Sequence, residues 1–399
     1  MRIGFTIRLF TPGSGGLQHH AAELVGHLRS LGHETVVVTR AVTRAPSYQD
    51  AFYFSEDRTV SDDPARIVRH PRWLNPLMWV IYKCVHRPTT RRLGISLYVF
   101  IYGGKVARAL RGVDVIHHIG QGSEMIGFAA GAAAKKLNVP FVVQPTAHPG
   151  QWGDGRLDVE LYKKADALLA HTRYEADWLK TLGLNQPIEV VGNGIEGRSD
   201  GDGQRFRQKY QIKGPIVLFL GRKEADKGYP LLKESFATVV KEMPDATLVC
   251  IGPGSKRQPT SEMPGVLELD FLDDTPKHDA LAACDVLCVP SEAESFGLVY
   301  MEAACYKKAI VARDIPVLRE LLGDAAVLLG KNADQGLNKT ELDSNLLGQN
   351  LIRLLNNPVQ RQELGAAAFA KSRDFIWPNV VRHFVSAYQN AMPHKRSVS

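Results

Sequence analysis

The sequence predicts an α/β protein built from two doubly wound, Rossmann-like domains that face a cleft. Over most of the 399 residues, short apolar runs typical of buried strands alternate with segments of helix length. The alternation is interrupted at a stretch dense in glycine and aspartate, residues 192–203, and then begins again. Because such a stretch makes a poor core and a good hinge, we expect one domain at residues 1–195, a second at 196–374 and a final segment at 375–399.

The expected elements follow from the positions of the apolar runs. In the first half, strands are expected at Ile3–Ile7, Thr35–Thr39, Val113–His117, Phe141–Gln144, Ala167–Ala170 and Ile188–Val191, and helices at Gln18–Leu31, Ser123–Leu137 and Thr172–Leu182. In the second half, strands are expected at Ile216–Leu220, Thr247–Ile251, Val266–Leu269, Val286–Val289, Ala309–Val311 and Ala326–Leu329, and helices at Tyr229–Met243, Lys277–Ala283, Leu298–Tyr306 and Val317–Leu322. A ligand of two such sheets would lie at the carboxyl ends of the strands.

Composition and cysteine usage indicate a cytoplasmic protein. Hydrophobic residues make up 44% of the chain and charged residues 23%, which are the proportions of an ordinary globular protein. The five cysteines form no CxxC pair, and we expect them to be reduced core residues. Met1 leads directly into a strand pattern, so no signal peptide is expected. No apolar run reaches the roughly 18–20 residues of a membrane span.

The net charge of +7 is concentrated in one block. From Pro64 to Val113 there is no acidic residue, but there are ten basic ones: Arg66, Arg69, Arg72, Lys83, Arg87, Arg91, Arg92, Lys105, Arg108 and Arg111. Trp73, Trp79 and Tyr82 lie among them. This mixture suits an anionic membrane surface or an anionic, lipid-linked acceptor, and either would place the protein at the inner membrane face. A helix pair with a solvated basic face explains it equally well. No nucleic-acid motif accompanies the block.

The segment from Pro290 to Glu302 is the most informative motif. A buried-strand pattern ends at Val289, the chain turns at Pro290, and a helix pattern begins near Phe296, with Glu294 in the turn and Glu302 in the helix. A helix N-terminus at the carboxyl end of a parallel strand binds anions. A carboxylate there would instead accept hydrogen bonds from a neutral polyol, because it would repel a phosphate. Phosphate and hydroxyl binding together indicate a nucleotide sugar.

Three further segments follow strands and carry polar groups. Arg222 and Lys227, after the first strand of the second half, could clamp a diphosphate, although two solvated bases in a surface loop would look the same. The glycines from Gly13 to Gly16 could let a backbone approach a ligand, or could form a tight turn, since the dinucleotide fingerprint is incomplete. His148, in a Gly/Pro-rich loop, is well placed to bond a substrate hydroxyl.

No bound metal is expected. Asp200 and Asp202 have the spacing of a metal-binding DxD pair, but their place in the glycine-rich stretch favours solvated hinge carboxylates. No cluster of histidine, cysteine and carboxylate residues supports a metal site elsewhere in the sequence.

Taken together, these motifs resemble the retaining glycosyltransferases of family 4, which have the GT-B fold. The resemblance covers nearly the whole chain, and its order and spacing are specific. Its marks are Gly15-Gly16, His148, the strand Ala165–Ala170, Asn193-Gly194, Gly221-Arg222, Lys227-Gly228, Gly252-Pro-Gly254 and the pair Glu294 and Glu302.

The resemblance implies a role for each site residue. Arg222 and Lys227 would hold the donor diphosphate, Glu302 the ribose, and Glu294 the donor sugar, with His148 near the reacting centre. Catalytic roles are thus implied for His148, Arg222, Lys227 and Glu294, and donor contacts for Gly15, Gly16, Leu272, Ser295, Phe296, Gly297 and Leu298 as well. Residues 375–389 look like the terminal helix that crosses back onto the first domain.

The implied reaction is a metal-independent, retaining transfer of a hexosyl group from a nucleoside diphosphate sugar to a hydroxyl, with no cofactor. UDP is expected from the habits of the family alone, and nothing about the acceptor transfers. A nucleotide-sugar epimerase or hydrolase on the same fold remains an alternative, as does a non-catalytic sugar-binding relative. The chain departs from the family after Glu302, where Lys307 and Ala309 replace the usual Gly and Pro. If that turn needs a positive φ, Lys307 is mildly strained.

Overall fold

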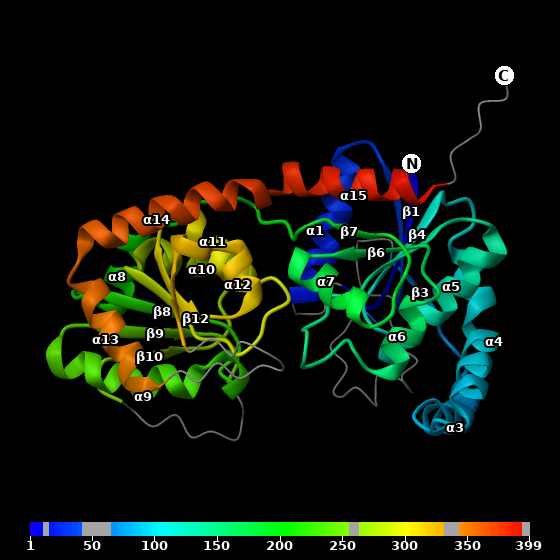
Figure 1. The fold of residues 1–399 in the computed structure, drawn as a ribbon, viewed down its shortest axis with the longest axis horizontal. Coiled ribbons are helices and arrows are strands. Elements are labelled where there is room, and N and C mark those ends of the chain that lie inside the picture. Colours follow the sequence, from blue (N-terminus) through cyan, green and yellow to red (C-terminus); the bar gives the residue numbers. More distant parts are fainter. Residues whose placement is uncertain (11–15, 42–64, 255–262, 331–342, 393–399) are drawn as a thin grey trace. The chain divides into compact units, whose positions relative to one another are not determined.

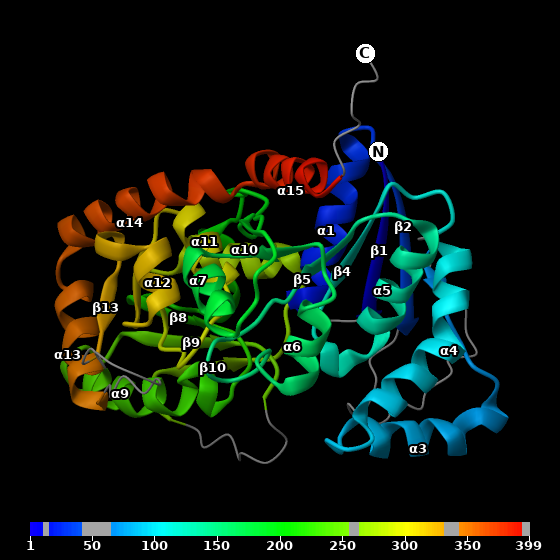
Figure 2. The ribbon, with the colours of Figure 1, turned by 45° about the vertical axis from the view of Figure 1, so that its right-hand side comes forward.

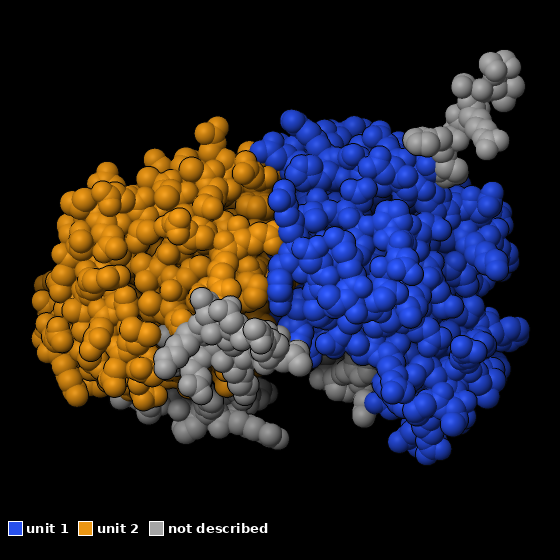
Figure 3. Space-filling model, in the orientation of Figure 1, with its two compact units in different colours: residues 1–194, 377–399 blue, residues 195–376 orange. Residues whose placement is uncertain are grey.

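The computed structural model describes residues 1–10, 16–41, 65–254, 263–330 and 343–392. The chain forms two compact units, residues 1–194 with 377–399, and residues 195–376 (Figures 1 and 3). The breaks lie beside the boundaries expected at residues 195 and 375. Because unit 1 takes its last segment from the far end of the chain, the polypeptide passes between the units twice.

Unit 1 is built on a seven-stranded parallel sheet with the order β3-β2-β1-β4-β5-β6-β7. Its strands are β1 (Arg2–Leu9), β2 (Glu34–Ala41), β3 (Arg66–Ile67), β4 (Val115–Ile119), β5 (Phe141–Gln144), β6 (Ala167–Ala170) and β7 (Ile188–Val190). Its helices are α1 (Gly16–Ser30), α3 (Asn75–Val85), α4 (Arg91–Ala109), α5 (Ile126–Leu137), α6 (Arg156–Tyr162), α7 (Arg173–Thr181) and α15 (Trp377–Ala391). The strand order reverses between β1 and β4, which is where such sheets bind ligands.

Unit 2 repeats the design with six parallel strands in the order β10-β9-β8-β11-β12-β13. They are β8 (Ile216–Leu220), β9 (Thr247–Ile251), β10 (Val266–Leu269), β11 (Val286–Val289), β12 (Ala309–Arg313) and β13 (Val327–Leu329). The helices are α8 (Gly203–Tyr210), α9 (Tyr229–Glu242), α10 (Asp274–Ala283), α11 (Leu298–Cys305), α12 (Pro316–Leu321), α13 (Ser344–Leu355) and α14 (Pro358–Ser372). The order reverses between β8 and β11. The predicted fold class, α/β with two Rossmann-like sheets, is therefore confirmed.

An additional helical layer distinguishes unit 1. Helix α5 packs on the sheet, α4 packs on α5, and α3 packs on α4, so that α3 is outermost (Figure 2). The close approach of α3 and α4 depends on Gly94, because a Cβ there would lie 2.7 Å from a methyl group of Val85. These two helices hold half of the ten basic residues of the block recognised in the sequence. None of the helices described in the structure is long and apolar enough to cross a bilayer.

The expectation of a hinge over the whole stretch 192–203 is wrong at its second half. Asp202 caps the N-terminus of α8, accepting hydrogen bonds from the backbone N–H groups of Gln204 (3.0 Å) and Arg205 (2.9 Å). Asp200 is paired with Arg198, whose Nε lies 3.0 Å from its carboxylate. The backbone N–H of Gly201 donates to the hydroxyl of Tyr306. This part of the stretch is therefore fastened to unit 2, and both carboxylates have structural partners.

Helix α15 completes the core of unit 1. Trp377 is 1% exposed, and its ring stacks on those of His20 and His27 at centroid distances of 5.7 and 5.1 Å. Gly194 makes room for it, since a Cβ there would lie 2.2 Å from the indole. His20 also hydrogen-bonds Asn193 at 2.7 Å. Burial lowers the pKa of His20 to about 4, so its ring is neutral at pH 7.

Candidate active site

The expected phosphate-binding loops lie at the carboxyl ends of β8 and β11, the two strands that flank the reversal of strand order in unit 2. The backbone N–H of Glu292 donates to the carbonyl oxygen of Asp226 at 2.9 Å, which joins the two loops. Gly228 has a φ of 69°, and a Cβ there would lie 2.3 Å from the carbonyl oxygen of Pro290. Only glycine fits this position without displacing the second loop.

The structure brings Lys227 and Glu294 together. The Nζ atom of Lys227 lies 2.8 Å from Oε1 of Glu294, and the side chains are only 16% and 9% exposed. Charges this far from solvent attract each other strongly, and either one alone would be costly to bury. The pair therefore fixes the direction of both side chains at the junction of the two loops.

Arg222 lies in the same loop as Lys227 but has different partners. Its guanidinium binds the carboxylates of Glu224 and of Asp226, the latter at 2.7 Å. The side chain is 46% exposed, so an incoming anion can reach it and would compete with these two acids. Arg222 and Lys227 thus lie in the same loop, as expected, but they have different partners. Arg222 lies on the solvent side of this loop.

Glu302 lies on α11 and is paired with a residue that the sequence did not point to. The Nζ atom of Lys277, on α10, lies 3.3 Å from Oε1 of Glu302 and 3.3 Å from Asp274. Burial lowers the pKa of Lys277, but the carboxylates of Glu302 and Asp274 outweigh it, and the pKa lies above its ordinary value. No local motif signals this contact, because it joins two helices whose residues are 25 positions apart.

The turn into α11 holds the remaining donor-loop candidates. Gly297 has a φ of 87° and lies at the N-cap of α11, where no side chain caps the helix. Phe296 is buried against Phe375, with ring centroids 5.1 Å apart. Ser295 and Leu298 flank this turn and are half-buried. Leu272 follows β10 at the same carboxyl edge of the sheet and is also half-buried. Of this group, residues 295–298 lie at the start of α11, where backbone N–H groups can bind a ligand.

The turn that ends α11 confirms the strain expected at Lys307. Its φ is 53°, in the left-handed region. The N–H groups of Lys307 and Lys308 donate to the carbonyl oxygens of Ala304 and Ala303, the hydrogen-bond pattern of a helix that ends in a Schellman motif. Glycine is the residue that this position favours.

Replacing Lys307 with glycine is therefore expected to stabilise unit 2 by about 1 kcal/mol, because relief of the left-handed strain exceeds the entropy lost by a glycine. The midpoint of thermal unfolding should rise by roughly 2–4 °C. Lys308→Gly is the matched control: that side chain donates to Ala282, so its loss should lower the midpoint. A lower midpoint for Lys307→Gly would contradict the assignment.

The site candidates of the first half belong to unit 1. Gly15 lies outside the described residues, and Gly16 is the first residue of α1. His148 lies in the loop after β5, where its ring packs on Trp152 with a centroid distance of 4.0 Å. Thr146, two residues earlier, has a φ of 50°. A left-handed threonine is unusual, and such strain is often found at functional loops.

Glu175 holds the His148 loop in place and was missed from the sequence. Its carboxylate accepts hydrogen bonds from the N–H groups of Ala147 (2.9 Å) and His171 (2.7 Å). Burial raises its pKa to about 7. A signal was present, since Thr172 and Glu175 have the spacing of a capping box, and the N–H of Glu175 does donate to the Thr172 hydroxyl. The motif predicts a helix start, but not the contact with Ala147.

Two family models match this chain. The model described as Glycosyltransferase Family 4 matches residues 14–197, and that described as Glycosyl transferases group 1 matches residues 202–371. A phosphatidyl-myo-inositol mannosyltransferase of Mycobacterium tuberculosis is 32% identical over 212 residues, which cover 52% of this chain and 55% of that protein. The match thus spans about half the length of this relative. The protein of the same name from Mycolicibacterium smegmatis is 26% identical over 404 residues, covering 98% and 94% of the two chains.

Solved structures agree with the fold. The Anabaena protein Alr3699/HepE, crystallised with UDP-glucose, has a TM-score of 0.69 at 17% identity, covering 98% of this chain and all of that one. At this level of identity the likeness concerns the fold alone. Since the two matched family models together span both units, and the motifs of the sequence lie at the carboxyl edges of both sheets, the chain belongs to the family 4 glycosyltransferases.

Proposed function

We propose that the protein transfers a hexosyl group from a nucleoside diphosphate sugar to a hydroxyl acceptor, with retention of configuration and without a metal ion. The observation that carries the proposal is the buried pair of Lys227 and Glu294 beside the accessible guanidinium of Arg222, at the reversal of strand order in unit 2. Cations and a carboxylate at one such edge match a ligand with a diphosphate at one end and hydroxyls at the other. The UDP-glucose complex of the similarly folded Anabaena protein supports this donor class.

In the proposed reaction, the bond between the sugar and the diphosphate breaks with its electron pair moving to the leaving oxygen. Arg222 and Lys227 stabilise the negative charge that develops there, and they do so more strongly in the transition state than in the ground state. The leaving oxygen accepts the proton of the incoming hydroxyl, which attacks from the same face of the sugar, so that configuration is retained. Glu294 accepts hydrogen bonds from sugar hydroxyls and keeps Lys227 directed at the diphosphate.

A thermal-shift panel of nucleoside diphosphates and their sugars tests the donor class. A ligand that binds only the native state at 100 times its Kd stabilises it by about 2.7 kcal/mol. We expect at least one diphosphate to raise the unfolding midpoint of the wild type and of Lys213→Met, a control at an exposed cation of unit 2, but not that of Lys227→Met. If no member of the panel shifts the wild type, the proposal fails. NMR of the product tests retention, and a chelator should leave turnover unchanged.

We further propose that the outer face of α3 contacts an anionic membrane surface. Met78, Ile81 and Val85 face inward and are fully buried. The outward side is apolar too, since Trp79 is 53% exposed and Trp73, just before the helix, is 77% exposed. A helix that is apolar all round normally has a partner on every side. The surrounding basic residues make an anionic interface the complementary partner.

Replacing Trp73 and Trp79 together with serine is expected to reduce co-sedimentation with phosphatidylglycerol vesicles by about tenfold or more, since each buried tryptophan contributes a large apolar area. Leu31→Ser, at another exposed apolar residue of unit 1 (52% exposed), is the control and should bind like the wild type. Binding should also weaken as salt increases. Binding that ignores anionic lipid content and salt would contradict the electrostatic part of the proposal.

A further inference from the structure

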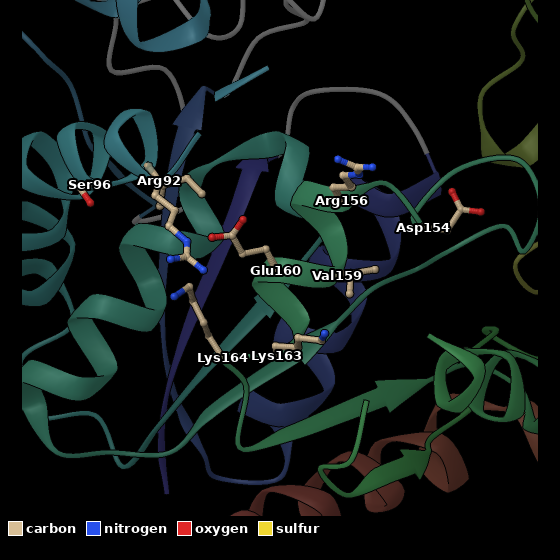
Figure 4. Close-up of a pocket in the computed structure, with 9 residues that line it drawn as sticks. Arg92, Ser96, Asp154, Arg156, Val159, Glu160, Lys163 and Lys164 are labelled. Atoms are coloured by element: carbon tan, nitrogen blue, oxygen red, sulfur yellow. The ribbon is translucent and has the colours of Figure 1, made fainter. Parts of the chain in front are cut away.

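Unit 1 contains a polar cavity that is open to solvent and distinct from the donor loops of unit 2. It has a volume of about 750 Å³ and lies between α4 and α6, including the loop that leads into α6 (Figure 4). This volume is typical of a site for a small molecule. Asp154 of the cavity lies only six residues beyond His148. The loop after β5 therefore contributes both His148 and part of the lining of the cavity.

Four cations line this cavity: Arg92 from α4, Arg156 from α6, and Lys163 and Lys164 from the residues that follow α6. Over the described ranges, none of the four has an ion-pair partner within 4 Å. This contrasts with Arg222, whose guanidinium is satisfied by two acids. In Figure 4 the head groups of Arg92 and Lys164 gather at one end of the cavity. Unpaired cations that share a concave site attract an anion.

Two carboxylates in the same cavity narrow the class of anion. Glu160 lies on α6 next to this cationic end, and Asp154 lies at the opposite side of the view (Figure 4). Carboxylates repel a bare phosphate but accept hydrogen bonds from hydroxyl groups. The combination of cations and carboxylates therefore suits a phosphate that is esterified to a polyol. Among the described residues that line the cavity, only Ile95 and Val159 are apolar, which is too little for a lipid tail inside the cavity.

We propose that this cavity holds the phosphate ester of a polyol and that this ester is part of the acceptor. Arg92 and Lys164 bind the phosphoryl oxygens, while Glu160 accepts a hydrogen bond from a hydroxyl of the polyol. The acceptor role rests on the proposed glycosyl transfer, whereas binding of the ester does not. The ester can be a soluble sugar or polyol phosphate, or the head group of a lipid. A lipid head group would leave its acyl chains outside the cavity. An exposed apolar side chain lies close by, because Phe100, which is 87% exposed, is four residues from Ser96 of the cavity on the same face of α4.

Binding of glycerol 1-phosphate, measured by titration calorimetry, tests the site directly. The double variant Arg92→Gln/Lys164→Gln is expected to weaken binding by about tenfold or more, because two charge-assisted hydrogen-bond donors are lost. Lys135→Gln/Lys136→Gln removes the same charge from the exposed end of α5 and is the matched control. It should change binding by less than about twofold.

A third variant tests the role assigned to Glu160. Glu160→Gln should strengthen the binding of inorganic phosphate, because a repulsive charge is gone, and should reduce the preference for glycerol 1-phosphate over inorganic phosphate. A uniform loss of affinity for both probes would overturn this role, since it would point to a structural defect. The shift in unfolding midpoint by the donor nucleotide is the folding control and should be unchanged in all three variants. It also separates a failure of this site from a failure of the donor site.

Vesicles separate the two sources of the ester. If the soluble probe binds and only the cavity variant loses it, a soluble phosphate ester is the ligand. If the cavity variant instead loses binding to phosphatidylcholine vesicles that contain phosphatidylglycerol, relative to the control variant, the ester belongs to a lipid head group. Equal losses in the cavity variant and the control variant would overturn the proposal, as would an absence of binding to both probes.

Discussion

Lys227→Met is expected to lower turnover by about 10²-fold or more, because it removes one preorganised donor from the charge that develops on the leaving diphosphate. The effect should fall on both KM and kcat, since Lys227 binds the donor diphosphate in the ground state and binds it more strongly in the transition state. Steady-state kinetics with the donor identified by the thermal-shift panel measures it. Unchanged turnover would refute the assignment of Lys227.

A stability measurement separates this catalytic effect from a loss of structure. Lys227→Met leaves Glu294 as an unpaired carboxylate that is only 9% exposed, so the single variant should also be less stable. Adding Glu294→Leu removes the unpaired charge and should restore much of the lost stability without restoring turnover. The two changes are thus non-additive for unfolding. If turnover returned together with stability, the role of Lys227 would be structural.

Trp377→Ala is expected to cost unit 1 about 3–5 kcal/mol, the usual penalty for truncating a buried aromatic side chain. The indole is almost fully buried, stacks on two histidines and fills the space above Gly194, so little can collapse into the cavity. Chemical denaturation should show an earlier transition for unit 1 and an unchanged one for unit 2. Trp79→Ala, at a tryptophan that is 53% exposed, should shift neither transition by more than about 0.5 kcal/mol. Comparable losses in the two variants would contradict the packing of α15 described above.

Most of the strands could be predicted from the sequence because parallel strands buried on both faces are continuous apolar runs. The pattern failed where polar residues are buried. The expected strand Val113–His117 in fact runs from Val115 to Ile119, since His117 and His118 both lie inside the sheet with no exposed surface. Their hydrogen bonds to Tyr388 and Thr6 come from remote segments, which no local pattern reveals. Strand β3 was missed because two residues are too few to form a pattern.

The start of α8 was misjudged for a different reason. The density of glycine and aspartate predicts a flexible stretch that includes Asp202 and Gly203, whereas Asp202 is the N-cap of a helix. Aspartate and glycine are frequent both in loops and at helix starts, so composition alone does not distinguish the two.

The parts of the site that depend on short stretches of sequence could be predicted. Arg222, Lys227 and Glu294 each lie in a loop that follows a strand, and the order of strands brings these loops to one edge, while Glu302 lies in the helix after the second loop. Lys277 and Glu175 could not be predicted in this way, because each of them contacts a residue of another element. The phosphate-ester cavity combines Arg92 with Lys164, which are far apart in the chain and come together only because α4 and α6 pack in the same unit. Contacts of this kind depend on tertiary packing and leave no signature in a window of sequence.

The discontinuity of unit 1 has a consequence for biosynthesis. On the ribosome, residues 195–376 emerge as one uninterrupted block and can fold as soon as they are clear of the exit tunnel. Unit 1, although synthesised first, must wait for Trp377–Ala391 before its socket around His20 and Gly194 is filled. A chain truncated before residue 377 and released from the ribosome would therefore combine a finished second unit with an unfinished first one.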